Sequence, residues 1–302
     1  MLPGSLIPFY VGAGRVPEDI DVDVLIVAGG GSSHTTIGDT EATRISAGGG
    51  AGGVSIQTGI TVEGSVSYTI AIGGGAVPNN RGSASSAFTY SSTGGGHGND
   101  NDDSGLYVAL MDGGSGGGGG IGYLPRPPYG ASSRNGGSGT VGQGNDGGDP
   151  YLVSSLSTSN VAGGGGGYSA AGANGSSGGA GGAGYNLINF SSTTNRYVAG
   201  GGGAGRAATS GVALGGNGGG GNGGNRNTSA TNGTANTGGG AGGPGWPSTG
   251  VQAGRQGGSG IVIIRYPGTA VKATGGSIST VTVGGQDYVV HEFTGSDTFK
   301  LI

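Results

Sequence analysis

Glycine constrains this chain more than any other residue type. It accounts for 83 of the 302 residues and occurs in packed runs with no regular period, such as 163–167 and the block 215–224. A glycine run has no side chain to bury, and glycine loses more conformational freedom on folding than any other residue. Backbone hydrogen bonds must therefore hold any ordered region of this kind together, because buried N–H and C=O groups need partners.

One backbone conformation satisfies this requirement. A glycine segment in the polyproline II conformation has three residues per turn and no internal hydrogen bonds. Its N–H and C=O groups then point outward in three directions, and the lack of Cβ atoms allows neighbouring segments to approach and bond to each other. Each such bond contributes about 0.5–1.5 kcal/mol net. We therefore predict a lattice of polyglycine II helices joined by loops.

Short apolar segments interrupt the glycine and predict a small β-sheet base. Residues 21–28 pass from alternation to a continuous apolar run, which is typical of a strand buried on both faces. Further strands are expected near 66–72, 261–266 and 278–293. Helical periodicity is absent, and glycine costs about 1 kcal/mol per helical residue relative to alanine. The predicted fold class is thus mainly β and irregular, with essentially no α-helix.

Three parts of the chain differ in composition. Residues 1–20 contain three prolines and are expected to form an extended attachment arm, with Ile7, Phe9 and Tyr10 as its contacts to a partner or to the protein's own body. The glycine-rich domain covers 21–267. Residues 268–302 are expected to form a C-terminal β segment that packs on the base or on a neighbouring subunit.

The overall composition argues against several function classes. Only 9% of the residues are charged and the net charge is −4, which provides no basic footprint for nucleic acid. There is no run of about 20 apolar residues, so no membrane insertion is expected. The first ten residues lack the pattern of a secretory signal peptide. No cysteine is present to form disulfides or thiolate metal sites.

Motifs for catalysis and for nucleotide binding are weak in this chain. Gly113–Gly117 matches the nucleophile-elbow pattern G-x-S-x-G, but a glycine-rich chain gives this match by chance and the elbow needs partner His and Asp residues. Matches to G-x-G-x-x-G precede no predicted helix, so no helix N-terminus is present to bind phosphate. We therefore expect neither enzymatic activity nor a cofactor.

The candidate binding residues lie where polar or aromatic patches interrupt the glycine, chiefly at 97–111, 121–134 and 244–256. Aromatic rings stack on sugars, and arginine can bind carboxylate or phosphate through two donors. The alternative is that these side chains only pin loops or cover the ends of the lattice. The polar cluster 99–103 reads as a solvated loop, with a cation site left open and no metal ligand assigned. The predicted receptor contacts are His97, Asp102, Tyr107, Tyr123, Arg126, Tyr129 and Trp246.

The strand motifs resemble a known family. The segments Asp23–Gly31, Asn232–Gly240 and Gly257–Pro267 look like the glycine-rich module of bacteriophage tail and virion appendage proteins. In that family a segment like His291–Phe299 commonly precedes the module, whereas here it follows. This departure suggests that the C-terminal segment folds back against 21–28 or pairs with another subunit. The predicted lattice also resembles the polyglycine adhesins at the tips of phage tail fibres.

The resemblance implies a non-enzymatic tail fibre or tip adhesin on the surface of a virion. Its loops would bind a host surface glycan or an outer-membrane protein, and its partners would be other fibre subunits, including copies of itself, for example as a trimer. Two alternatives stay open at this point. One is a purely structural component, such as a capsid decoration or a filament subunit. The other is an ice-binding protein, which would need a regular row of threonine or alanine that we do not see.

Overall fold

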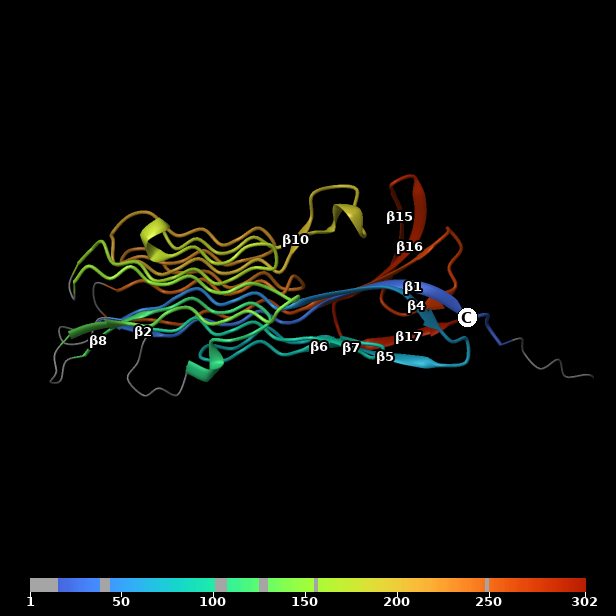
Figure 1. The fold of residues 1–302 in the computed structure, drawn as a ribbon, viewed down its shortest axis with the longest axis horizontal. Helices are drawn as coiled ribbons and strands as arrows, with labels where there is room; N and C mark the ends of the chain where they lie inside the picture. Colours follow the sequence, from blue (N-terminus) through green and yellow to red (C-terminus); the bar gives the residue numbers. More distant parts are fainter. Residues whose placement is uncertain (1–15, 39–43, 101–107, 125–129, 155–156, 248–249) are drawn as a thin grey trace, which may run out of the picture.

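The chain folds into an elongated body with β-sheets at one end and parallel wavy segments at the other (Figure 1). The computed structural model describes residues 16–38, 44–100, 108–124, 130–154, 157–247 and 250–302. We call the sheet end the base and the opposite end the distal end. The described residues contain no α-helix and three short 3₁₀ turns, which are η1 (Val108–Leu110), η2 (Gly175–Ser177) and η3 (Leu187–Asn189).

Two five-stranded antiparallel sheets form the base. The first contains, in spatial order, β15 (Ser277–Val283), β16 (Gln286–Phe293), β13 (Ile261–Pro267), β1 (Ile20–Val27) and β4 (Val54–Val62). The second contains β14 (Ala273–Thr274), β17 (Asp297–Leu301), β5 (Ser67–Ala71), β6 (Ser85–Ala87) and β7 (Tyr90–Ser92).

Three smaller sheets lie in the remainder of the chain. Two of them are strand pairs, and the third has three strands, all antiparallel. Their strands are β10 (Tyr185–Asn186) with β11 (Tyr197–Val198), β12 (Gly250–Gln252) with β2 (Thr36–Gly38), and β3 (Arg44–Ile45) with β8 (Ile121–Leu124) and β9 (Gly130–Ser133).

Strand β1 is buried on both faces, as its apolar run predicts. Val24 and Ile26 point into a core between the two base sheets, where they meet Phe299 of β17. Leu25 and Val27 point to the opposite face and join a second core with Leu187, which lies in η3. Because side chains alternate along a strand, this one segment joins the base sandwich to the layer above it.

The glycine runs form rods that bond to one another through their backbones. Residues 46–54 form the central rod, and each of its amides donates to another segment. Every third amide reaches the same neighbour. The amides of residues 46, 49 and 52 donate to the carbonyls of 244, 241 and 238 in one rod. Those of residues 47, 50 and 53 donate to the carbonyls of 99, 96 and 93 in a second rod, and those of 48 and 51 donate to 163 and 166 in a third. All these bonds are 2.8–3.2 Å long.

The carbonyls of the central rod show the same three-residue period towards three further rods. The carbonyls of residues 50 and 53 accept hydrogen bonds from the amides of 31 and 28 in one rod. Those of 46 and 49 accept from the amides of 205 and 202 in a second, and those of 48 and 51 accept from the amides of 118 and 115 in a third. Three rods that accept and three that donate surround the central rod on all sides. A three-residue period with bonds in every direction is the pattern expected of polyglycine II.

The same pattern continues outward and connects the lattice to the base. The segment 28–33 continues directly from β1. Its six backbone amides, taken in order along the chain, donate to the carbonyl oxygens of residues 53, 83, 258, 50, 80 and 255. The rod at 93–99 likewise follows β7, and the segment 254–260 leads into β13. Sheet strands therefore become lattice rods without a linker, and the two ends of the molecule share one continuous network of backbone hydrogen bonds.

The spacing between rods explains why the residues are glycine. A Cβ atom added at Gly49 would lie inside 3.0 Å of the carbonyl oxygen of Gly31, and one added at Gly165 would clash in the same way with that of Gly49. Real Cβ atoms essentially never come this close to backbone. Only glycine can occupy these positions, because the neighbouring rod fills the space of a side chain.

The predicted fold class is confirmed, and the strands expected near 21–28, 66–72, 261–266 and 278–293 are all present. Residues 54–62 form a further strand, β4, with a bulge between its pairs with Val22 and Val24. The C-terminal segment lies against β1 through its side chains, since Phe293 and Phe299 share a core with Val24 and Ile26. Its strands are not hydrogen-bonded to β1, because β13 lies between β16 and β1 and β17 joins the second sheet.

Substitution of glycine inside the lattice tests this packing. We expect Gly49→Ala to lower the free energy of unfolding by about 3 kcal/mol or more, since backbone on the neighbouring rod cannot move aside as a side chain could. Gly74→Ala is the matched control, because a Cβ atom at Gly74 meets nothing within 4 Å. Chemical denaturation of both variants measures the difference. Equal stabilities for the two variants would contradict close packing of the rods.

Candidate binding site at the distal end

Side chains gather again where the lattice ends furthest from the base. The strand pair β2–β12 and the sheet β3–β8–β9 both close this end (Figure 1). Behind them lies a small apolar cluster, which we call the distal core. Its buried members are Ile45, Ala47, Ile121, Ala162, Ala204, Ala207 and Ala213, with Leu152, Val161 and Trp246 partly buried against them.

Trp246 is held in place from two directions. Its backbone amide donates to the carbonyl of Arg206 over 3.2 Å, and its partly buried ring packs on the distal core. The guanidinium of Arg226 lies 4.0 Å from the centre of the ring. Such a cation–π contact contributes about 0.5–1 kcal/mol at an exposed site. The indole and the guanidinium thus form a preorganised aromatic and cationic pair.

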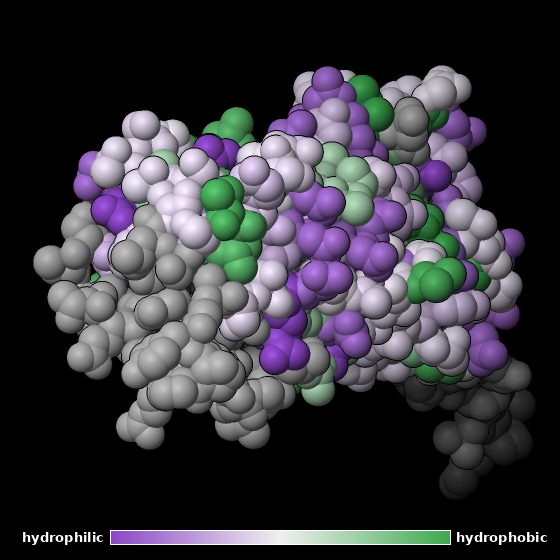
Figure 2. All heavy atoms as spheres, turned by 60° about the vertical axis from the view of Figure 1, so that its left-hand side comes forward, coloured by the Kyte–Doolittle hydropathy of each residue, from purple (hydrophilic) through white to green (hydrophobic). Residues whose placement is uncertain are grey.

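Three apolar side chains at the same end are exposed to solvent. Tyr151 is 44% exposed, Val153 is 54% exposed and Val251 in β12 is 63% exposed. Backbone pairing connects Tyr151 to Trp246. Tyr151 forms an isolated β-bridge with Val161, and Val161 forms another with Arg206. The carbonyl of Arg206 accepts the hydrogen bond from the amide of Trp246. Figure 2 shows this end with apolar residues scattered among polar ones. Such a surface offers stacking and apolar contact with little charge.

A buried ionic group lies inside the lattice on the way to the distal end. Asp100 Oδ2 is 2.9 Å from His34 Nδ1 and 3.2 Å from Arg44 NH1, and the Asp100 side chain is only 1% exposed. The rings of His34 and His97 are 5.7 Å apart, and Ser32 Oγ lies 3.3 Å from His97 Nδ1. The group ties together three stretches of chain that are distant in sequence.

The pKa values of this group follow from its burial and its charges. Burial, and to a smaller extent the neighbouring His34, lower the pKa of His97 from 6.5 to about 3 against the opposing effect of Asp100. Burial alone would raise the pKa of Asp100, but its hydrogen bond and charge interactions with His34, and then those with Arg44, outweigh this effect and lower it. His97 is therefore neutral and Asp100 ionised at neutral pH.

The structure separates the predicted contact residues into three sets. Trp246 lies at the distal end, and the backbone of Tyr123 pairs with Ala131 in the β8–β9 hairpin there. His97 has no exposed surface because it sits in a lattice rod, not in a loop, so we take it out of the candidate contact set. The others, Asp102, Tyr107, Arg126 and Tyr129 together with Ile7, Phe9 and Tyr10, lie outside the described residues.

The acidic cluster 99–103 is only partly described. Its one described carboxylate, that of Asp100, is engaged by His34 and Arg44. In the part of the chain that the structure describes, no group of three or more His, Cys, Asp or Glu side chains could hold a metal ion. The same described residues contain no helix long and apolar enough to cross a membrane.

Sequence reasoning did not single out Arg226, Tyr151 or Val251. One signal was present, since Arg226 is one of only two charged residues between positions 200 and 250. A tyrosine near a glycine run is not in itself a sign of exposure, since Tyr168 and Tyr185 flank such runs and pack edge to face on each other, with ring centroids 5.5 Å apart. The exposure of Val251 follows from the pairing of β12 with β2, which no local pattern reveals.

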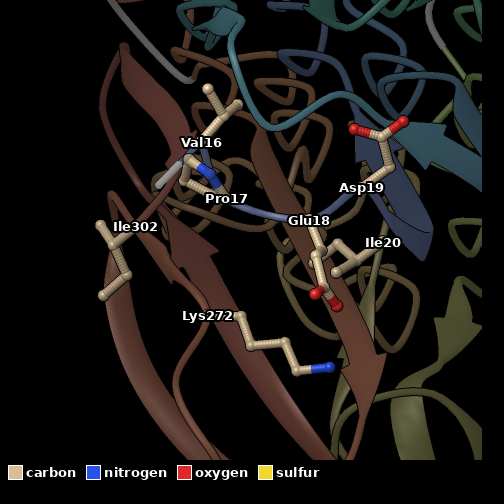
Figure 3. Close-up of a pocket in the computed structure, with 7 residues that line it drawn as sticks. All are labelled: Val16, Pro17, Glu18, Asp19, Ile20, Lys272 and Ile302. Atoms are coloured by element: carbon tan, nitrogen blue, oxygen red, sulfur yellow. The ribbon is translucent and has the colours of Figure 1, made fainter. Parts of the chain in front are cut away.

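The base has hollows of its own. One of about 370 Å³ is lined by Val16, Pro17, Glu18, Asp19, Ile20, Lys272 and Ile302 (Figure 3). The side chains of Glu18 and Lys272 extend to the same side of it, whereas Asp19 turns away and accepts a hydrogen bond from the amide of Gly64 over 2.9 Å. This hollow adjoins the point where the leader segment enters the base.

Comparison with known proteins identifies the family. The profile described as "Glycine-rich domain" matches residues 11–267. The chain therefore belongs to the glycine-rich domain family. This match covers the whole lattice and ends at the last residue of β13. No curated protein and no solved structure gives a significant match to the chain.

The buried histidine predicts an acid-sensitive fold. Since the folded-state pKa of His97 is about 3 and the ordinary value is 6.5, the unfolded chain takes up a proton that the folded chain does not. The contribution of His97 to stability is therefore complete above pH 6.5 and is lost progressively as the pH drops towards 3. We expect His97→Asn to flatten this dependence, measured as the denaturation midpoint between pH 7 and pH 4. An unchanged slope in the variant would contradict the role of His97.

Proposed function

We propose that this member of the glycine-rich domain family is a non-enzymatic adhesin of a virion, most specifically of a bacteriophage tail fibre tip. The lattice acts as a stiff spacer, because its rods are cross-bonded in all directions and leave little freedom between base and distal end. The proposal depends above all on one observation, which is that exposed recognition side chains return at the distal end after a long stretch of glycine.

The chemistry of the distal end suits a neutral surface ligand. The ring of Trp246 is fixed by Arg226, and Tyr151 and Val251 add exposed apolar area. Aromatic rings that are held rigidly lose little entropy on binding, and Trp, Tyr and Arg are the residues most enriched at binding hot spots. We propose a glycan or an outer-membrane protein of the host cell as the ligand.

The base would then face the particle. Val16, the first residue that the structure describes, lines the hollow together with Ile302, at the end opposite the distal core. In this proposal the leader attaches the chain to another fibre subunit, and the lattice carries the distal end away from it.

Cell binding by the purified chain tests the proposal. The double variant Tyr151→Ala, Val251→Asp removes exposed distal side chains without touching the lattice, and we expect it to bind a host cell or its isolated surface glycan at least tenfold more weakly. Val271→Asp is the matched control, because Val271 is 47% exposed at the base. Binding is measured by flow cytometry with labelled protein on a panel of bacterial strains and glycans.

Two results would oppose the proposal. If the chain binds no strain and no glycan of the panel, a purely structural role is favoured. If the distal variant binds as well as the control, or if both lose binding equally, the contact lies elsewhere. Equal melting temperatures for both variants would show that any loss of binding is local.

A further inference from the structure

Strand β15 forms an open edge of the first base sheet. It pairs with β16, and the hairpin of these two strands projects from the base (Figure 1). Every residue of β15 is exposed or only partly buried, and Ile278 is 44% exposed. Among the described residues, no strand other than β16 pairs with it.

The hairpin register shows which backbone groups face outward. Gly284 and Gly285 both have positive φ, at 59° and 84°, which is the pattern of a two-residue type I′ turn. Val283 and Gln286 therefore form the hydrogen-bonded pair that closes the turn. Alternation along the strand then turns the N–H and C=O groups of Ile278, Thr280 and Thr282 away from β16.

This edge lacks the features that usually prevent pairing between sheets. Its sequence, SISTVTV, contains no charged residue and no proline, and its register with β16 has no bulge. An exposed edge of this kind is a template for another strand. The opposite edge of the same sheet, β4, does have a bulge, with Gly59 at positive φ and its amide bonded to Asp23 Oδ1. One edge of the sheet is thus blocked and the other is open.

We propose that β15 pairs antiparallel with β15 of a second copy of this chain, about a two-fold axis at Thr280. Thr280 would then lie opposite its own equivalent, and Ile278 opposite Thr282. The outward groups of these residues would form about six backbone hydrogen bonds.

The sequence of β15 favours a second copy as the partner. Antiparallel pairing about Thr280 places Ile278 beside Thr282 and Ser279 beside Val281, and β-branched and hydroxyl side chains are favourable neighbours across strands. It brings no like charges together, because the strand has none. Such an interface is isologous and closes on itself, so it ends at a dimer. Strand pairing alone buries little area, so we expect a dimer that dissociates on dilution.

Cysteine cross-linking tests the register directly, because the chain has no cysteine of its own. In the proposed dimer the two Thr280 Cα atoms would lie about 5.5 Å apart, within disulfide range. We expect Thr280→Cys to form a covalent dimer under mild oxidation. Ser277→Cys is the control on the same strand, since its two copies would lie about 20 Å apart. The readout is the fraction of dimer on a non-reducing gel.

A second measurement uses no cysteine. Sedimentation equilibrium of the unmodified chain is expected to show a shift from a 28.3 kDa monomer to twice that mass as concentration rises. Thr280→Lys should remove this shift by placing two charges face to face, whereas Ser91→Lys on the edge strand β7 should keep it. The proposal is overturned by a monomer at all concentrations, by a dimer that survives Thr280→Lys, or by equal cross-linking at positions 277 and 280.

Discussion

Everything in this structure depends on how the central rod satisfies its backbone. Its amides and carbonyls reach six neighbouring rods with a period of three residues, and no side chain takes part in these bonds. An unpaired buried N–H or C=O would cost about 1–3 kcal/mol, so the arrangement stands only if nearly all groups are paired. Glycine follows from this geometry as a requirement, because at Gly48, Gly49, Gly50 and Gly52 the carbonyl of an adjacent rod occupies the space that a Cβ atom would take.

This construction separates the molecule into regions with different chemistry. Conventional apolar cores form at the base and at the distal end, where Ile45 and Val54 terminate the two ends of the central rod. Ala51 lies between these two residues, six positions after Ile45 and three before Val54. Because both spacings are multiples of three, the three-residue period places Ile45, Ala51 and Val54 on the same face of the rod. Side chains that could bind a ligand are therefore concentrated where the rods end. The proposed adhesive surface and the proposed strand pairing lie at opposite ends of the body.

The sequence could predict the parts of the fold that depend on local pattern. The apolar run at 21–28 predicts a strand buried on both faces, and the glycine runs predict rods, since neither needs knowledge of distant partners. The order of the rods could not be predicted, because every rod carries the same backbone groups and almost no side chains to specify a neighbour. For the same reason His97 read as part of a polar loop, whereas the glycines on either side place it in a lattice rod. The Trp246–Arg226 pair joins residues 20 positions apart through rod packing, which no spacing rule anticipates.

The central claim is that backbone hydrogen bonds between glycine rods carry the fold, and amide hydrogen exchange tests it most directly. The amides of residues 46–54 are the ones to follow by NMR at neutral pH. The account predicts that they exchange as slowly as those of the buried strands β1 and β13, because they open only when the whole lattice opens. Exchange of these amides at the rate of an unstructured chain, with β1 and β13 still protected, would contradict it.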